Sequence, residues 1–200
     1  MAQVEFLFPI PVYIEEDLID EKENKLLHDR IRQLSSSIPK GGKEWNCNTF
    51  TSKDTYDLRD DKTFSNVINK VTHHVNAFAK TYASDWEYKL GTGWFNVSQK
   101  NSYQEYHNHA DSSFSAVYYV SLPPGSGEIV FRSGEDNMQS LRGMVEYNRI
   151  NSTYWGFEPV ERSLMIFRSS LQHMVKMGIN KKPRISLALN YLLEMIDENL

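Results

Sequence analysis

Cysteine is nearly absent from this sequence. Cys47 is the single cysteine among 200 residues, so no disulfide can form within the chain. This excludes the small secreted scaffolds that replace part of a hydrophobic core with several disulfides. We therefore expect a reducing compartment, and specifically the cytoplasm.

Long hydrophobic runs and an excess of positive charge are also missing. The apolar runs are far shorter than the roughly 20 residues that a membrane-spanning helix needs. Residues 1–5 contain no basic stretch, so we expect no secretory signal and no membrane partner. The formal net charge is −4. This charge argues against nucleic acid as the main partner, because nonspecific binding to phosphates depends on Lys and Arg.

What the chain does contain is typical of a folded protein with a full core. Hydrophobic residues make up 40% of the sequence and charged residues 24%, which are ordinary values. The 10 Phe, 11 Tyr and 4 Trp favour strands, so a β-rich core is expected. The length predicts a single domain over residues 1–200.

The first part of the chain contains two helical patterns. Two prolines keep residues 6–13 extended. Asp17 can cap a helix that runs to about Leu34, and Thr63 can cap a second helix whose apolar residues share one face. We predict that these helices form a support over about residues 1–85, packed on one side of the core.

From about residue 86 to 195 the sequence changes to short runs typical of strands. Strands are expected at residues 94–98, 114–120, 128–131, 163–167 and 184–192. The turn at 123–127 indicates that the second and third of these form a hairpin. Several short strands predict a sandwich or barrel. The weakly periodic segment 133–161 is expected to be a long loop or lid.

A candidate metal site starts from His109 and Asp111. Residues two positions apart on a strand point to the same face, so an imidazole and a carboxylate can reach one ion. His173, just past a predicted strand, is the candidate third ligand. Two histidines and one carboxylate leave open positions on Fe(II), as in non-heme oxygenases. The spacing alone is common in a chain with 6 His, and a strand-end histidine beside a solvated aspartate is the alternative.

A second pair of residues supports this chemistry. Arg184 follows His173 in the sequence, and Ser186 shares its strand face. A guanidinium fork with a neighbouring hydroxyl can hold the far carboxylate of 2-oxoglutarate, whose keto acid end chelates iron. The alternative is that Arg184 is a surface arginine after the basic segment 181–183.

This order of motifs resembles the Fe(II)/2-oxoglutarate-dependent oxygenases. Tyr106 stands three residues before His109, as in the prolyl-hydroxylase type. The chain is similar to a group of these oxygenases with a Phe-Pro-x-Pro-Val segment, a His-x-His run, a Ser-Gly-Val-Tyr-Tyr strand and a Phe-Pro-Ser-x-x-x-His run. The matching residues here are 8–12, 107–109, 115–119 and 167–173. Ala116 replaces the usual Gly and Arg168 the usual Pro, and neither position is expected to bind metal.

The resemblance implies a mainly β (α+β) fold, a double-stranded β-helix or jelly roll. It also implies an enzyme that uses Fe(II), 2-oxoglutarate and O2 to oxidise a substrate, with release of succinate and CO2. The residues expected to hold the iron are His109, Asp111 and His173. Those expected to contact 2-oxoglutarate are Arg184, Ser186, Tyr106, Tyr118 and Asn96.

The sequence leaves one ligand choice open. His107, His109 and Asp111 alternate, so all three can share a strand face. The offset from Tyr106 and the preference for two histidines and one carboxylate favour His109 and Asp111 as ligands. His107 would then either support the ligands from behind or face the substrate. The alternative is a three-histidine site in which His107 replaces Asp111.

A rival function uses the same scaffold. A cupin-like metal-binding or ligand-binding module has the same β architecture without turnover of 2-oxoglutarate. The Arg184-x-Ser186 pair favours the oxygenase. The substrate, a small molecule or peptide, cannot be named from the sequence, and the oligomeric state stays open, a homodimer included.

Overall fold

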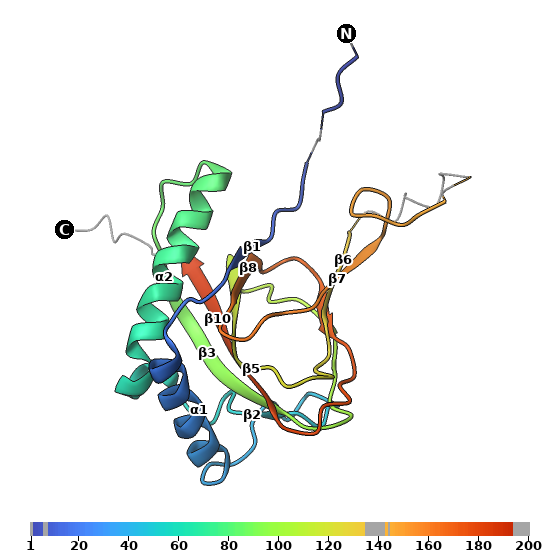
Figure 1. The fold of residues 1–200 in the computed structure, drawn as a ribbon. Helices are drawn as coiled ribbons and strands as arrows, with labels where there is room; N and C mark the ends of the chain where they lie inside the picture. Colours follow the sequence, from blue (N-terminus) through green and yellow to red (C-terminus); the bar gives the residue numbers. More distant parts are fainter. Residues whose placement is uncertain (1, 6–7, 135–142, 144, 194–200) are drawn as a thin grey trace, which may run out of the picture.

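A computed structural model describes residues 2–5, 8–134, 143 and 145–193. Two antiparallel sheets form the molecule (Figure 1). The six-stranded sheet has the order β1-β8-β5-β10-β3-β2, and the four-stranded sheet has the order β4-β9-β6-β7. Among the described residues, no helix has the length and apolar character needed to cross a membrane.

The strands have the following bounds. The large sheet contains β1 (Tyr13–Glu15), β2 (Phe50–Thr51), β3 (Tyr88–Ser98), β5 (Phe114–Ser121), β8 (Leu164–Arg168) and β10 (Arg184–Leu193). The small sheet contains β4 (Gln104–His107), β6 (Ile129–Arg132), β7 (Tyr154–Phe157) and β9 (His173–Val175). The two sheets face each other as a double-stranded β-helix, which confirms the predicted fold.

Two helices cover the outer face of the large sheet, as predicted (Figure 1). They are α1 (Glu21–Ser35) and α2 (Ser65–Ala79). The cap of α1 is Asp20, whose side chain accepts a hydrogen bond from the Glu23 backbone N–H. The predicted cap, Asp17, instead has a left-handed backbone (φ 53°) and forms an ion pair with Arg162.

The second helix begins two residues later than the expected cap. A short 3-10 turn, Lys62–Phe64, precedes α2, and the side chain of Asp61 caps this turn by accepting from the Thr63 backbone N–H. Phe64, at the start of α2, makes no side-chain cap. The helix therefore continues from an already capped turn, and Thr63 is not its cap.

Strict alternation along the large sheet separates two cores. On β5, Ala116 and Tyr118 pack toward the helices, whereas Tyr119 packs between the sheets. The same alternation on β10 buries Leu187 and Leu189 beneath the helices. The opposite face of each strand is therefore free to line the space between the two sheets.

Three expectations for the chain's organisation need correction. The strands β5 and β6 do not form a hairpin, because β6 pairs with β7 and β9 in the other sheet. Within the expected loop 133–161 the structure contains the strand β7, while residues 135–142 and 144 lie outside the described residues. The first 85 residues also supply β1 and β2 to the large sheet, and so provide more than helical support.

Candidate metal and cosubstrate site

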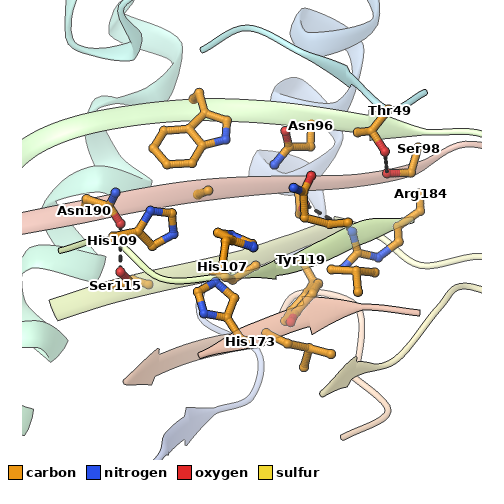
Figure 2. Close-up of a pocket in the computed structure, with 18 of the residues that line it drawn as sticks. Thr49, Asn96, Ser98, His107, His109, Ser115, Tyr119, His173, Arg184 and Asn190 are labelled. Atoms are coloured by element: carbon orange, nitrogen blue, oxygen red, sulfur yellow. Dashed lines mark hydrogen bonds between the residues drawn. The ribbon is translucent and has the colours of Figure 1, made fainter. Parts of the chain in front are cut away.

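Three histidines meet between the two sheets (Figure 2). His107 ends β4 and His173 begins β9, and the two are direct partners in the strand register. His109 lies just beyond β4, where its backbone N–H donates to the Ser169 carbonyl at 2.9 Å. One ring nitrogen of each histidine lies within 4.8 Å of those of the other two. This is close enough for one metal ion to reach all three.

The surroundings keep these imidazoles neutral and oriented. Burial lowers the pKa of His109 to about 4 and that of His173 to about 3. The Nδ1 atoms of His107 and His173 lie 2.8 and 2.9 Å from the carbonyls of Glu105 and Leu171. A carbonyl only accepts, so Nδ1 carries the proton and leaves the Nε2 lone pair for a metal.

Asp111 lies outside this histidine cluster. The strand β4 ends at His107, and the chain then turns, with the Ser112 N–H bonded to the His109 carbonyl at 3.1 Å. Alternation on a strand therefore does not extend to Asp111, which is exposed in the turn. The structure brings His107, and not Asp111, together with His109 and His173, and this placement favours the three-histidine alternative.

A cavity of about 660 Å³, its opening included, extends from the histidines along β10. Arg184 and Ser186 line it as predicted, and both are buried. The guanidinium lies 5.4 Å from the ring centroid of Tyr119 and 3.5 Å from the Ser186 hydroxyl. No carboxylate of the described residues lines this cavity, and the only charge partner found for the buried Arg184 is the Tyr119 hydroxyl. The alternative of a surface arginine is therefore excluded.

Unsatisfied polar atoms are concentrated in the same cavity. Among the described residues, five buried side-chain nitrogen or oxygen atoms have no hydrogen-bond partner. Four of them belong to cavity residues: Trp94 Nε1, Asn96 Oδ1, the Tyr119 hydroxyl and Arg184 Nε. Buried polar groups are nearly always paired in folded proteins. The concentration of these atoms indicates a cavity built for a polar ligand.

The three further contacts expected from the sequence have different outcomes. Asn96 lines the cavity. Tyr106 is 40% exposed and is not among the lining residues. Tyr118 points to the helices, where its hydroxyl donates to Asn24 Oδ1 at 2.9 Å. Its neighbour Tyr119 faces the cavity instead, because successive strand residues point to opposite faces.

Sequence reasoning missed most of the cavity wall, and four of the missed residues matter most for the chemistry of the site. Trp94, Tyr119, Ser115 and Asn190 all line it. A signal for Asn190 was present, because it lies on the strand face shared by Arg184 and Ser186. Tyr119 is the β5 partner of Ser186, but this register could not be read from the sequence.

A jelly roll that encloses three histidines close enough to hold one metal ion, and a buried arginine without an acidic partner, is characteristic of oxygenases that use a metal and an anionic cosubstrate. The model of the family described as "Putative 2OG-Fe(II) oxygenase" matches residues 92–190, which contain the whole cavity face of β3, β5 and β10. Over these residues the chain matches a family of 2-oxoglutarate–Fe(II) oxygenases, which are oxidoreductases.

Solved structures share the fold over most of their length. An oxidoreductase of the 2OG-Fe(II) oxygenase family from Burkholderia pseudomallei has 17% identity and a TM-score of 0.62, covering 90% of this chain and 84% of its own. A Pseudomonas putida prolyl-4-hydroxylase has 13% identity and a TM-score of 0.65, covering 93% and 94%. HygX from Streptomyces hygroscopicus, solved with nickel, 2-oxoglutarate and hygromycin B, has 11% identity and a TM-score of 0.65, covering 91% and 82%. No curated protein matches the chain at a significant level.

Proposed function

We propose that the protein is an Fe(II)- and 2-oxoglutarate-dependent oxygenase that hydroxylates a small molecule or peptide. The observation that carries this proposal is the buried guanidinium of Arg184, which has no acidic partner, in the cavity that also contains the three histidines. A buried cation without an acidic partner is costly unless a ligand supplies the charge. The distal carboxylate of 2-oxoglutarate would do so.

The residues present fit both the metal and the cosubstrate. Imidazole nitrogens suit Fe(II), and His107, His109 and His173 would hold it. Arg184 and Ser186 would bind the distal carboxylate together with the hydroxyl of Tyr119. Burial raises the pKa of Tyr119 to about 12, so this hydroxyl remains a donor at neutral pH. Asn96, on the β3 wall, would contact the cosubstrate between these two ends.

The bound iron, with 2-oxoglutarate and O2, would supply the oxidising chemistry, in which succinate and CO2 are released and a substrate carbon is hydroxylated. The chain itself would orient the reactants and exclude water. The side chains of Val117, Ile129 and Phe167 form an apolar part of the wall near the histidines. A dry wall strengthens the attraction between Arg184 and a carboxylate.

The relatives indicate the range of substrates. One is a prolyl-4-hydroxylase, and HygX was solved with hygromycin B. Both a peptide and a small molecule are therefore compatible with this scaffold, and a substrate screen would distinguish them.

The proposal predicts a metal-dependent response to 2-oxoglutarate. At a concentration 100 times the Kd, the cosubstrate should stabilise the protein by about 2.7 kcal/mol. This corresponds to a rise in Tm of roughly 5–10 °C for a domain of this size. The shift should require Mn(II) or anaerobic Fe(II), and Fe(II) in air should give slow, uncoupled formation of succinate. Metal binding without either response would favour the cupin-like module.

Two neighbouring tyrosines give a matched comparison. Tyr119→Phe should weaken 2-oxoglutarate binding by roughly tenfold, because it removes a hydrogen bond to a charged group. Tyr118→Phe should leave the affinity unchanged but lower the free energy of unfolding by about 1–3 kcal/mol, because Asn24 loses a buried partner. Calorimetric titration and urea unfolding measure the two effects. Equal affinities in the two variants would contradict the assignment of Tyr119.

A further inference from the structure

We infer that the cavity contains a separate substrate subsite, in which Trp94 Nε1 and the Asn190 amide donate hydrogen bonds to a carbonyl or carboxylate oxygen of the substrate. This inference rests on the proposed function, because it takes Arg184 to be occupied by 2-oxoglutarate. The position is at the far end of the cavity from Arg184. Figure 2 shows Arg184 at one end and Asn190 at the other, with the histidines between them.

The strand register brings the two donors together. Trp94 on β3 is the direct partner of Ala188 on β10, and Asn190 is two residues further along the same face. Such diagonal neighbours are roughly 7–8 Å apart between backbones. Ala188 has only a methyl group, which leaves space between the indole and the amide. Both donors are therefore available to one small group above Ala188.

A chain of buried hydroxyls fixes the orientation of the Asn190 amide. Ser115 Oγ donates to Asn190 Oδ1 at 2.9 Å and lies 2.8 Å from Ser169 Oγ. A hydroxyl has one proton, so Ser169 must donate to Ser115. The carbonyl oxygen of the amide is thus occupied, and its NH2 group remains for the cavity. The backbone carbonyl of Ser169 accepts a hydrogen bond from the His109 backbone N–H, which links this subsite to the histidine cluster.

Trp94 supplies the second donor. Its side chain is buried, its Nε1–H has no partner, and its ring centroid is 5.8 Å from that of His109. An indole N–H can only donate, and no acidic side chain of the described residues lines the cavity. A ligand that enters the cavity can supply the acceptor that the protein does not provide. A cationic group would find no counter-charge here, so the substrate class is a neutral or anionic molecule with an exposed carbonyl or carboxylate.

The experiment follows indole ¹⁵N–¹H signals by NMR in protein loaded with Zn(II) and saturating 2-oxoglutarate. Trp94→Phe identifies the Trp94 signal, and the exposed Trp86 is the internal control. The probes are N-methylacetamide and acetate, with methylammonium as the cationic control. We expect both oxygen acceptors to move the Trp94 signal downfield, and methylammonium and Trp86 to give no response.

Two substitutions at Asn190 sharpen this test. Asn190→Ala should weaken probe binding at least fivefold and change the Kd for 2-oxoglutarate less than twofold. Asn190→Asp retains the shape of the side chain but replaces the donor with a carboxylate. This variant should no longer bind N-methylacetamide or acetate, and methylammonium should bind to it instead. The subsite would be refuted if 2-oxoglutarate alone moved the Trp94 signal and Asn190→Ala also weakened the binding of 2-oxoglutarate. The two donors would then bind the cosubstrate. The subsite would also be refuted if probe binding did not depend on Asn190. A protein that binds the probes but not 2-oxoglutarate would retain the subsite and refute the proposed function.

Discussion

His107→Ala is expected to abolish tight Fe(II) binding, whereas Asp111→Ala should retain it. His107 belongs to the set of three histidines whose ligand atoms lie within 4.8 Å of one another, and Asp111 is exposed in the following turn. Loss of groups that merely orient a ligand already costs about 10–100-fold in metal affinity. Loss of the ligand itself should cost at least about 100-fold.

The two variants should be compared side by side for bound iron and for uncoupled succinate. His107→Ala should lose both, and Asp111→Ala should keep both, with the Tm of each metal-free protein close to that of the parent. Loss of iron from Asp111→Ala, with its retention in His107→Ala, would restore the ligand set of two histidines and one carboxylate. His173→Ala is the positive control, because both ligand sets include His173.

Arg184→Met is expected to weaken 2-oxoglutarate binding at least tenfold without loss of metal. A hydrogen bond to a charged group contributes about 1.5–3 kcal/mol, and this pair lies in a buried cavity. The same substitution should raise the Tm of the ligand-free protein or leave it unchanged, because it removes a buried cation that has no acidic partner. A Tm of the ligand-free protein that does not fall, together with a lower affinity for 2-oxoglutarate, would identify Arg184 as a binding residue.

Arg184→Lys separates charge from shape. It keeps a positive charge but loses the planar fork, so its affinity should lie between those of the parent and Arg184→Met. Calorimetry in the presence of Mn(II) gives the affinity, and metal analysis confirms that the metal remains bound. An unchanged affinity in Arg184→Met would remove the main support for the oxygenase and favour the cupin-like module.

The parts of the site that the sequence could predict lie where regular strand alternation persists. On β10, Arg184 and Ser186 are two positions apart, and the strand runs without interruption between them, so their shared face followed directly. The same rule failed at Asp111, because β4 ends at His107 and the chain turns before the aspartate. The turn-forming residues Asn108, Asp111, Ser112 and Ser113 marked this end, but the strand interpretation was extended across them.

Other features depend on contacts that are distant in the sequence. Whether Tyr118 or Tyr119 faces the cavity depends on which side of β5 the helices cover, and alternation alone gives both choices. The pairing of β6 with β9 was hidden for a similar reason, since the turn after β5 looks the same whether the chain returns in one sheet or crosses to the other.

The short strand β1 has a consequence for how the protein can be handled. It pairs with β8 at the border of the large sheet, and the hydroxyl of Tyr13 lies 2.8 Å from His74 Nδ1, which ties this border to the helix layer. Without residues 13–15, the backbone N–H and C=O groups along one side of β8 would be open to strands of other molecules. Shortening the chain at its N-terminus would therefore promote aggregation through sheet edges, even though these residues lie outside the cavity.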